Sequence, residues 1–576
     1  MLNKTLQEIT EEIITRSQKS RSLYISRMQK AHLTKPQRGE LGCSNIAHAI
    51  APCSAHEKDN LIKMQSENIA IVSAYNDMLS AHQPFVSFPP LIKRAMNLNG
   101  ATAQFAGGVA AMCDGVTQSQ PGMEMSLFSR DNIAQSTAIA LSHNMFDGAI
   151  MLGVCDKIVP GMFIGAMKFG HLPVIFAPAG PMDSGISNAK KAQVRQDYAE
   201  NKASEEELLK AESASYHSSG TCTFYGTANS NQMLMEIMGL HLAGSSFVNA
   251  NTPLRDALTE MASLKLLEFS PLKESYLPLY EIINEKSFVN ALVGLLATGG
   301  SSNHTIHLIA MARSCGITLT WDDFDALAKI TPLICKMYPN GSADVNHFHS
   351  AGGMRVVISE LLKAGLLHED VNTVMGKGLS NYLQEPILKD GKIEYIKSSL
   401  KSQDENIIST CTKPFSEDGG LKLLNGNIGR SVIKTSALKD DNKFIQAPAK
   451  VFYTQEELKS AFARGELEMD FVAVLPYQGP KSNGMPELHG LLPSMGALQD
   501  RGFKVAIITD GRMSGASGKV ASAIHLCPEA KDGGIISKIK DGDIITLDSV
   551  NGILDVSLGD EELSTRVIYT PDLSSN

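Results

Sequence analysis

The segment "GAIMLGVCDKIVPG" (148–161) predicts how the N-terminal half of this chain folds. It begins with a short apolar run, which is followed by a loop and by a helix that opens near Pro160. The next apolar segment, "LPVIFAPAGPM" (172–182), predicts a further strand and turn. Strands and helices that alternate in this way are typical of a parallel sheet. We therefore expect Cys155, Asp156 and Lys157 at the carboxyl end of a strand, where open α/β sheets bind their ligands.

A second region of strands lies near the C-terminus. The segments "FVAVLPYQGP" (471–480) and "KVAIITDGRMSGASG" (504–518) are apolar strands that run into glycine-rich loops. After them, "KDGDIITLDSVNGILDVSL" (540–558) has short apolar segments separated by turn residues. This pattern predicts antiparallel β structure. Residues 190–215 are highly charged and predict a solvated helix or insertion.

Composition excludes several classes of protein. The chain has 576 residues, 52 basic and 61 acidic side chains, and a net charge of -9, so we expect neither a nucleic-acid nor a membrane partner. No apolar stretch reaches the roughly 18 residues of a membrane span. Glu8, Glu11 and Glu12 interrupt any targeting signal, and we expect a cytoplasmic protein. The nine scattered cysteines indicate reduced thiols, some of them metal ligands.

Two cysteines lie in segments that suit a metal centre. Charged neighbours are expected to lower the pKa of Cys155, and the thiolate is the form that binds soft metals or iron–sulfur clusters. Cys222 lies in "GTCTFYGTANSNQM" (220–233), where small polar residues leave backbone N–H groups free. A lone cysteine is more often a small buried hydrophobic residue. The chain has no C-x-x-C spacing, which argues against zinc-ribbon and ferredoxin-type frameworks.

Carboxylates suited to a hard cation occur in separate loops, at Asp114, Asp156 and Glu487. Each alone is more often a cap or turn residue. Together with Cys155 and Cys222, they predict a soft metal site beside a hard one.

The loop "TDGRMSGASGK" (509–519) contains a candidate catalytic serine, Ser514. The loop is neither a P-loop nor a G-x-S-x-G nucleophile elbow, because Met513 and Arg512 occupy positions where those motifs need glycine. Ser514 is therefore either a structural turn residue or a base or nucleophile that nearby cations activate. His304 and His307 in "GGSSNHTIHL" (299–308) lack an H-E-x-x-H context, which favours substrate contacts over zinc binding.

Several of these segments together resemble the iron–sulfur dihydroxyacid and sugar-acid dehydratases. The resemblance runs from about residue 40 to the C-terminus and includes four further motifs: "SAYNDMLSAHQPF" (73–85), "DGVTQSQPGMEMSLFSR" (114–130), "YPNGSADVNHFHSAGG" (338–353) and "GPKSNGMPELHG" (479–490). It implies an α/β fold with a large N-terminal domain around a parallel sheet and a barrel-like, β-rich C-terminal domain of β/β/α type. We expect an N-terminal helical segment at 1–60, the cluster-binding domain at 61–380, a junction at 381–445 and the serine-bearing domain at 446–576.

The resemblance also implies cofactors and their ligands. Cys155 and Cys222 would bind an iron–sulfur cluster, 4Fe–4S rather than 2Fe–2S. The third cluster ligand stays open, because Ala81 stands where some relatives carry a cysteine; Cys113 is the first candidate, with Cys43 or Cys53 behind it. A Mg²⁺ or Mn²⁺ ion would be held by a second set, in which the lysine is an amine or a carbamate: Asp114, Asp156, Lys157 and Glu487.

The implied reaction is the dehydration of a 2,3-dihydroxy acid, with Ser514 as the base and Lys157 as a second catalytic residue. The expected substrate is a phosphorylated sugar acid, 6-phosphogluconate, because the segments around the pocket offer polar groups rather than an apolar wall. The substrate-binding candidates are Asn76, His82, Ser301, Ser302, Asn303, His304, Arg512 and Lys519. The alternatives are a branched-chain dihydroxyacid dehydratase, a dehydratase of unphosphorylated sugar acids, and an iron–sulfur redox sensor, which would have no use for Ser514. We expect a homodimer.

Overall fold

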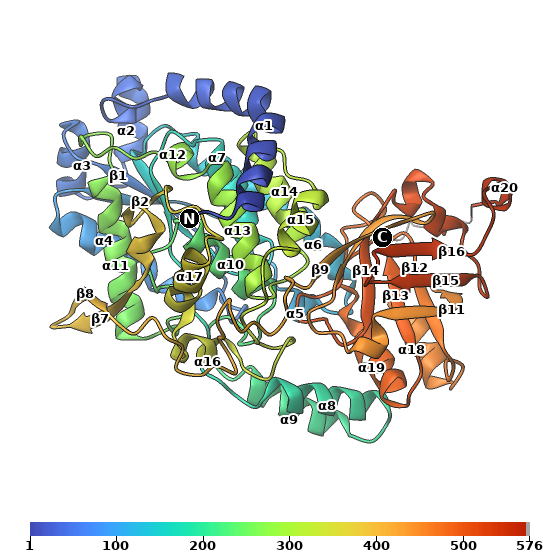
Figure 1. Cartoon of the computed structure of the whole chain (residues 1–576). Coiled ribbons are helices and arrows are strands. Elements are labelled where there is room, and N and C mark those ends of the chain that lie inside the picture. Colours follow the sequence, from blue (N-terminus) through green and yellow to red (C-terminus); the bar gives the residue numbers. More distant parts are fainter. Residues whose placement is uncertain (569, 572–576) are drawn as a thin grey trace.

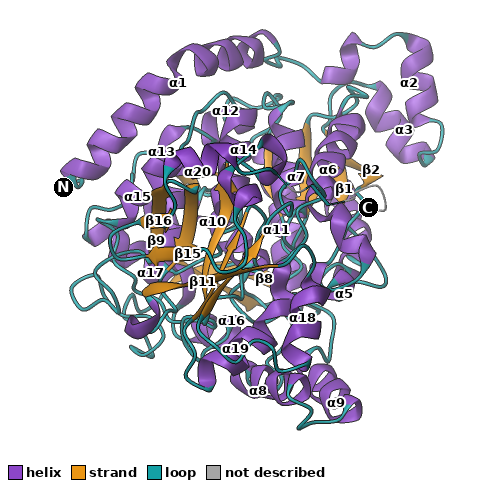
Figure 2. Ribbon diagram, turned by 90° about the vertical axis from the view of Figure 1, so that its right-hand side faces the viewer, coloured by secondary structure: helices purple, strands orange, loops and turns teal. Residues whose placement is uncertain are grey.

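The computed structural model describes residues 1–568 and 570–571, and it consists of a large helical part and a smaller barrel (Figure 1). Helices surround the strands, and α8 and α9 lie as a pair at the edge of the molecule (Figure 2). Within these residues, no helix is both long and apolar enough to span a lipid bilayer.

The larger part is built around a parallel sheet with the strand order β2-β1-β3-β4. Its strands are β1 (Asn68–Ser73), β2 (Thr102–Gly108), β3 (Gly148–Leu152) and β4 (Val174–Phe176). Every residue of β3 is buried, which explains its uniformly apolar sequence. The helix after it, α7 (Ile158–Met167), begins two residues before Pro160. The strand, loop and helix predicted from residues 148–161 are therefore confirmed.

Helices cover this sheet and fill the rest of the larger part. They are α1 (Lys4–Lys30), α2 (Cys43–Ile50), α3 (Ala55–Ile62), α4 (Phe88–Leu98), α5 (Asp114–Thr117), α6 (Ser126–Leu141), α7, α8 (Asn188–Ala199), α9 (Glu205–Ser215), α10 (Thr227–Ile237), α11 (Pro253–Glu268), α12 (Leu279–Ile282), α13 (Glu285–Ala297), α14 (His304–Ser314), α15 (Trp321–Ala328), α16 (Val345–Ser350) and α17 (Gly353–Lys363). Most residues of α10 and α13 are buried, so these two helices form the interior of the larger part.

Short hairpins follow the helical region, and then the chain enters a closed eight-stranded barrel. The hairpin strands are β5 (Asn372–Thr373), β6 (Gly376–Lys377), β7 (Gln384–Lys389) and β8 (Lys392–Lys397). The barrel strands are β9 (Leu421–Gly426), β10 (Gly429–Lys434), β11 (Phe444–Val451), β12 (Phe471–Leu475), β13 (Val505–Thr509), β14 (Ala521–Cys527), β15 (Ile544–Asp548) and β16 (Ile553–Val556). The barrel's helices are α18 (Gln455–Ala463), α19 (Leu492–Asp500) and α20 (Asp560–Thr565).

The barrel has an apolar core on each side of its wall. Val472 and Val474 of β12 belong to one core, while Phe471 and Ala473 belong to the other, together with Met495 of α19. Successive strand residues point to opposite faces, so a strand buried on both sides reads as a continuous apolar run. Strands β15 and β16 pair antiparallel, as their turn-rich sequence predicts. The predicted fold class is therefore confirmed.

Two features differ from the predicted organisation. Strands β9 and β10 lie within the predicted junction at 381–445, yet they close the barrel beside β16 and β14. Both strands have exposed residues near one end. Their sequences therefore mix polar and apolar residues and lack the continuous apolar run by which a buried strand is recognised. The charged segment 190–215 forms α8 and α9, which confirms the helix expected there, but it also contacts the barrel. Gln196 of α8 donates to Asp500 of α19 at 2.8 Å, so the helix pair braces the barrel against the larger part.

A buried ion pair attaches the N-terminal helical segment to the sheet. Arg38 Nη1 donates to Asp147 Oδ2 at 2.7 Å, and neither side chain is exposed. Asp147 lies directly before β3, and its carboxylate also accepts from the backbone N–H of Asn68 at the start of β1.

Arg38→Met should destabilise the protein by about 3–5 kcal/mol, because it leaves the Asp147 carboxylate buried without its counterion. Urea unfolding followed by circular dichroism measures the loss. Lys35→Met is the matched control: Lys35 pairs with Glu40 on the surface, where such pairs contribute about 1 kcal/mol or less. Equal effects of the two substitutions would contradict this role for Arg38.

Candidate active site

Three carboxylates meet where the barrel contacts the larger part. Asp114 is the first residue of α5, Asp156 follows β3, and Glu487 belongs to the loop before α19. All three are buried, and one oxygen of each lies within 4.8 Å of an oxygen of the other two. The structure thus brings together the predicted carboxylate ligands from both parts of the chain. Buried carboxylate oxygens at this spacing fit a hard divalent cation such as Mg²⁺ or Mn²⁺.

Two cations lie among these carboxylates. Lys157 Nζ donates to Asp156 Oδ2 at 2.8 Å and also contacts Asp114 Oδ2. Arg512 Nη1 donates to Glu487 Oε1 at 2.9 Å and Asp156 Oδ2 at 3.2 Å, while its Nη2 donates to Asp114 Oδ2 at 2.6 Å. Arg512 is completely buried. It was expected to bind substrate, but in this structure its donors are occupied by the carboxylates.

Burial and charge act against each other in this cluster. Burial raises the pKa of Glu487 to about 8, with Asp114 and Asp156 adding to the shift and Arg512 opposing it. Burial also disfavours the charged form of Asp156, but Lys157 and Arg512 outweigh it and hold that pKa below its usual range. For Lys157, the two aspartates outweigh burial and raise the pKa. A divalent cation would therefore help to keep all three carboxyl groups ionised.

Three cysteine thiols form the second group. The Cys155 thiol donates a hydrogen bond to that of Cys113, and Cys222 lies close enough for the charge of Cys113 to raise its pKa. Cys155 has a φ of 75°, a left-handed conformation that is strained for a side chain of this kind. Cys43 is exposed and Cys53 accepts from Gln104. The geometry thus favours Cys113 among the candidates for the third cluster ligand.

The acidities of these thiols differ from the sequence-based expectation. The hydrogen bond to Cys113 and burial raise the pKa of Cys155, so the prediction that its charged neighbours lower this pKa is wrong. Burial raises the pKa of Cys222 to about 12, whereas the hydrogen bond from Cys155 lowers that of Cys113 to about 7. Thiolates at Cys155 and Cys222 therefore need a bound cation to stabilise them, and thiolate ligands fit a soft metal or an iron–sulfur cluster.

The candidate serine lies in the loop between β13 and β14. Ser514 is half-buried, and its Oγ accepts from the N–H of Ala516 at 3.3 Å. Gly515 packs so closely against the larger part that a Cβ there would lie 2.6 Å from Ser301 Oγ and from the backbone nitrogen of Thr227. Residues from both parts of the chain therefore enclose the serine loop.

The predicted substrate residues separate into several environments. Ser301, Asn303 and His304 are fully buried in a network in which Ser301 Oγ and Thr227 Oγ1 lie 2.8 Å apart. Asn303 Nδ2 donates to the same Thr227 oxygen at 3.1 Å, and His304 Nε2 lies 2.9 Å from the hydroxyl of Ser230. These contacts fix the loop before α14.

The remaining predicted substrate residues lie in other surroundings. Asn76 Oδ1 accepts from the N–H of Met78 within its own turn, and His82 is fully buried, which lowers its pKa to about 4. Lys519 forms a surface ion pair with Asp500. The structure therefore leaves Arg512 without a free donor, while Lys519 lies in an exposed pair with Asp500.

Sequence reasoning missed Ser126 beside the carboxylates, and it expected substrate contacts for His307, which also lies there. Ser126 Oγ donates to Asp114 Oδ1 at 2.9 Å, and it also accepts from Arg512 at 2.7 Å. His307 Nε2 lies 3.9 Å from Asp156 Oδ1. Ser126 lies inside the quoted motif 114–130, but nothing in its local sequence distinguishes it from other helix-terminal serines.

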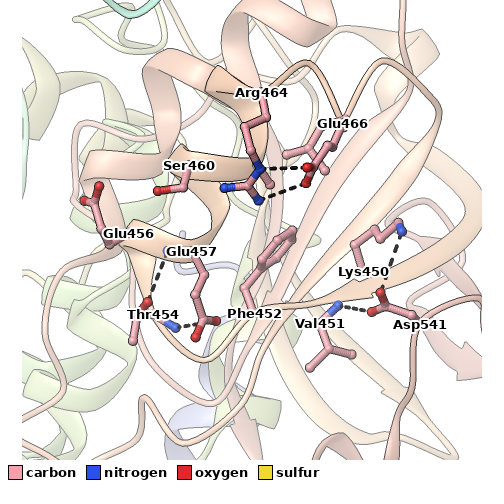
Figure 3. Close-up of a pocket in the computed structure, with 12 residues that line it drawn as sticks. Lys450, Val451, Phe452, Thr454, Glu456, Glu457, Ser460, Arg464, Glu466 and Asp541 are labelled. Carbon is pink, nitrogen blue, oxygen red and sulfur yellow. Dashed lines mark hydrogen bonds and ion pairs between the residues drawn. The ribbon is translucent and has the colours of Figure 1, made fainter.

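A pocket on the surface of the barrel lies beside α18 (Figure 3), and none of the predicted site residues lines it. Its charges are paired with one another: Arg464 Nε donates to Glu466 at 2.6 Å, and Lys450 Nζ lies 3.6 Å from Asp541. Glu457 caps the start of α18. The carboxylate and thiol groups therefore remain the better candidate for chemistry.

Comparison with known proteins agrees with these groups. The models "Dihydroxy-acid/6-phosphogluconate dehydratase N-terminal" and "C-terminal" match residues 67–382 and 406–572. The chain is 56% identical to a phosphogluconate dehydratase of Pseudomonas aeruginosa (97% of this chain, 92% of the relative) and 53% identical to one of Escherichia coli K12 (100% and 95%). It is 34% identical to a dihydroxy-acid dehydratase of Caldicellulosiruptor bescii (87% and 89%). The chain belongs to the dihydroxy-acid/6-phosphogluconate dehydratase family.

Proposed function

We propose that this chain is a hydro-lyase that converts 6-phosphogluconate to 2-keto-3-deoxy-6-phosphogluconate, a step of the Entner–Doudoroff route. The observation that carries the proposal is the placement of three thiols and three carboxylates side by side through the pairs Cys113–Asp114 and Cys155–Asp156. Sequence identity to relatives supports the choice of substrate. The chain is 56% and 53% identical to the two phosphogluconate dehydratases but 34% identical to the dihydroxy-acid dehydratase.

The reaction breaks two bonds that do not break readily in water. The C2–H bond breaks as a base takes the proton, and the C3–O bond breaks as the hydroxyl leaves and ends as water. The resulting enol tautomerises to the 2-keto acid. Charge builds up on the substrate carboxylate as the C2 proton departs, so the site must place positive charge there.

Cys113, Cys155 and Cys222 would hold the iron–sulfur cluster, and Asp114, Asp156 and Glu487 the divalent ion. Three thiolates would leave one iron of a 4Fe–4S cluster without a protein ligand. When bound, the cluster supplies a Lewis acid for the C3 hydroxyl, and the divalent ion stabilises charge on the substrate carboxylate.

The chain's own residues perform the remaining tasks. Ser514 takes the C2 proton, a role that requires its hydroxyl to be deprotonated by virtue of nearby positive charge. Lys157 supports the substrate carboxylate from within the carboxylate cluster, as the amine or as a carbamate; intact-protein mass spectrometry distinguishes the two. The family resemblance also leads us to propose a homodimer, which sedimentation of the holoenzyme tests.

The substrate assignment predicts a large preference for the phosphorylated acid. On one anaerobic preparation, kcat/KM for 6-phosphogluconate should exceed that for gluconate at least a hundredfold, or about 2.7 kcal/mol. Turnover of 2,3-dihydroxyisovalerate should be lower still. Equal or better turnover of that branched acid would assign the chain to amino-acid biosynthesis instead, and a preference for gluconate would make it an unphosphorylated sugar-acid dehydratase.

Cys113→Ser should lose bound iron and sulfide together with activity, because serine is a poor replacement for a thiolate cluster ligand. Cys53→Ser is the matched control, since the Cys53 thiol accepts from Gln104 rather than from another thiol. Iron and acid-labile sulfide assays after anaerobic purification measure the effect. Full cluster content in Cys113→Ser, or loss in the control, would show that the third ligand is another residue.

Ser514→Ala should retain its iron and sulfide but lose C2 proton removal by about 10²- to 10⁴-fold, the usual effect of removing a general base. Exchange of the C2 hydrogen with deuterated solvent, followed by NMR, measures this step directly. Ser522→Ala, in the adjoining strand β14, is the control. Unchanged exchange in Ser514→Ala would assign the base to a different group.

A further inference from the structure

Lys434, the last residue of β10, is a cation without a carboxylate partner. Its Nζ donates to the carbonyl of Gly299 at 2.8 Å, and the ion pairs of the described residues do not include it. Burial lowers its pKa to about 7. A lysine ammonium has three donors, so two remain beyond the bond to Gly299. Lys434 is half-buried, and charges shielded from solvent are normally paired, so its two remaining donors are available to an anion.

Lys191 of α8 is a buried lysine that also has no carboxylate partner among the described ion pairs, but aromatic rings contact its ammonium. Burial lowers its pKa to about 8, but its ammonium lies 4.3 Å from the centre of the Tyr216 ring and 5.4 Å from that of Phe224. It also donates to the Tyr216 hydroxyl at 3.0 Å. Aromatic faces therefore compensate the charge of Lys191, whereas none of the ring contacts described for this chain involves Lys434.

Lys434 lines a small cavity between the barrel and the larger part. The cavity encloses about 230 Å³ that is partly open to solvent, and its narrow interior has room for about one water molecule. Its lining contains no Asp or Glu, and it includes Gly299, Ser301, Ser302 and Lys434.

Ser302 adds unpaired donors to the same cavity. Its side chain is not hydrogen-bonded, and its backbone N–H also has no partner among the described residues. Ser302 is 8% exposed and lines the cavity, so these donors are largely shielded from bulk solvent. Two free ammonium protons, a hydroxyl and an N–H group with no competing carboxylate suit an oxyanion.

This cavity adjoins the serine loop. A Cβ on Gly515 would lie 2.6 Å from Ser301 Oγ, and one on Gly518 would lie 2.6 Å from the Cβ of Ala437. The segments that contain Ser302 and Lys434 therefore both flank the loop that carries Ser514. A substrate that reacts at C2 beside this serine and carries an anion at its far end could reach both places.

We propose that Lys434 and Ser302 bind the phosphate of the substrate, which rests on the proposed function. Because the interior of the cavity is narrow, the phosphate would lie at its mouth and direct its oxygens towards Lys434 and Ser302. Lysine is a common phosphate ligand, since its compact charge forms strong hydrogen bonds to phosphate oxygens. Lys434 thereby takes the role that the sequence suggested for Arg512 and Lys519.

The test compares Lys434→Met and Lys434→Arg with Lys443→Met, a barrel lysine that pairs with Asp440. Lys434→Met should lower kcat/KM for 6-phosphogluconate about a hundredfold but change that for gluconate less than threefold. Lys434→Arg should have a kcat/KM for 6-phosphogluconate at least tenfold above that of Lys434→Met. Lys443→Met should match the wild type. Inorganic phosphate, measured by calorimetry on the holoenzyme, should bind the wild type and lose affinity by a similar factor in Lys434→Met.

Each other outcome is informative. Equal losses with 6-phosphogluconate and gluconate would make Lys434 a structural residue and overturn the proposal, as would unchanged values for 6-phosphogluconate and inorganic phosphate. If the wild type itself shows no preference for 6-phosphogluconate, the proposed function fails. The calorimetric comparison then still decides the binding site, because retained phosphate affinity in Lys434→Met would overturn it.

Discussion

The contact between Arg512 and three buried carboxylates is the constraint on which the rest of the site depends. Asp114 and Asp156 come from the larger part, while Glu487 and Arg512 come from the barrel. Carboxylates at this spacing repel one another strongly in a poorly solvated interior, so they must be offset by positive charge. Arg512 and Lys157 provide part of it, and Arg512 also holds the two parts of the chain together.

This charge balance explains why Arg512 and Lys434 have different roles. When all three carboxylates are ionised, the two cations leave a net negative charge, which a divalent ion would reverse. Arg512 cannot leave the cluster without exposing buried carboxylates to one another, and it is therefore a poor partner for an anionic substrate group. Lys434 has no carboxylate partner among the described ion pairs, and its Nζ donates instead to the carbonyl of Gly299. Arg512 thus organises the carboxylates, whereas Lys434 is the cation that we propose for the substrate phosphate.

Local sequence patterns predicted the buried strands whose ends carry the site. The strand before Cys155 and the apolar strands β12 and β13 are visible because burial on both faces demands uninterrupted apolar residues. The proximity of Asp114, Asp156 and Glu487 could not be derived from local pattern, because the first and last are separated by most of the chain; the family resemblance supplied it. Nothing local distinguishes Arg512 from Lys434, since their roles depend on which carboxylates the fold brings near them. Strands β9 and β10 escaped notice because their exposed ends carry polar residues.

We propose that the adjacent thiols and carboxylates hold a soft and a hard metal side by side. Anomalous X-ray diffraction from anaerobically grown crystals containing Mn²⁺, collected at the iron and manganese edges, tests it most directly. The account predicts iron density bounded by Cys113, Cys155 and Cys222, and a separate manganese peak among Asp114, Asp156 and Glu487. Iron held without one of these cysteines, or manganese bound away from the three carboxylates, would contradict it.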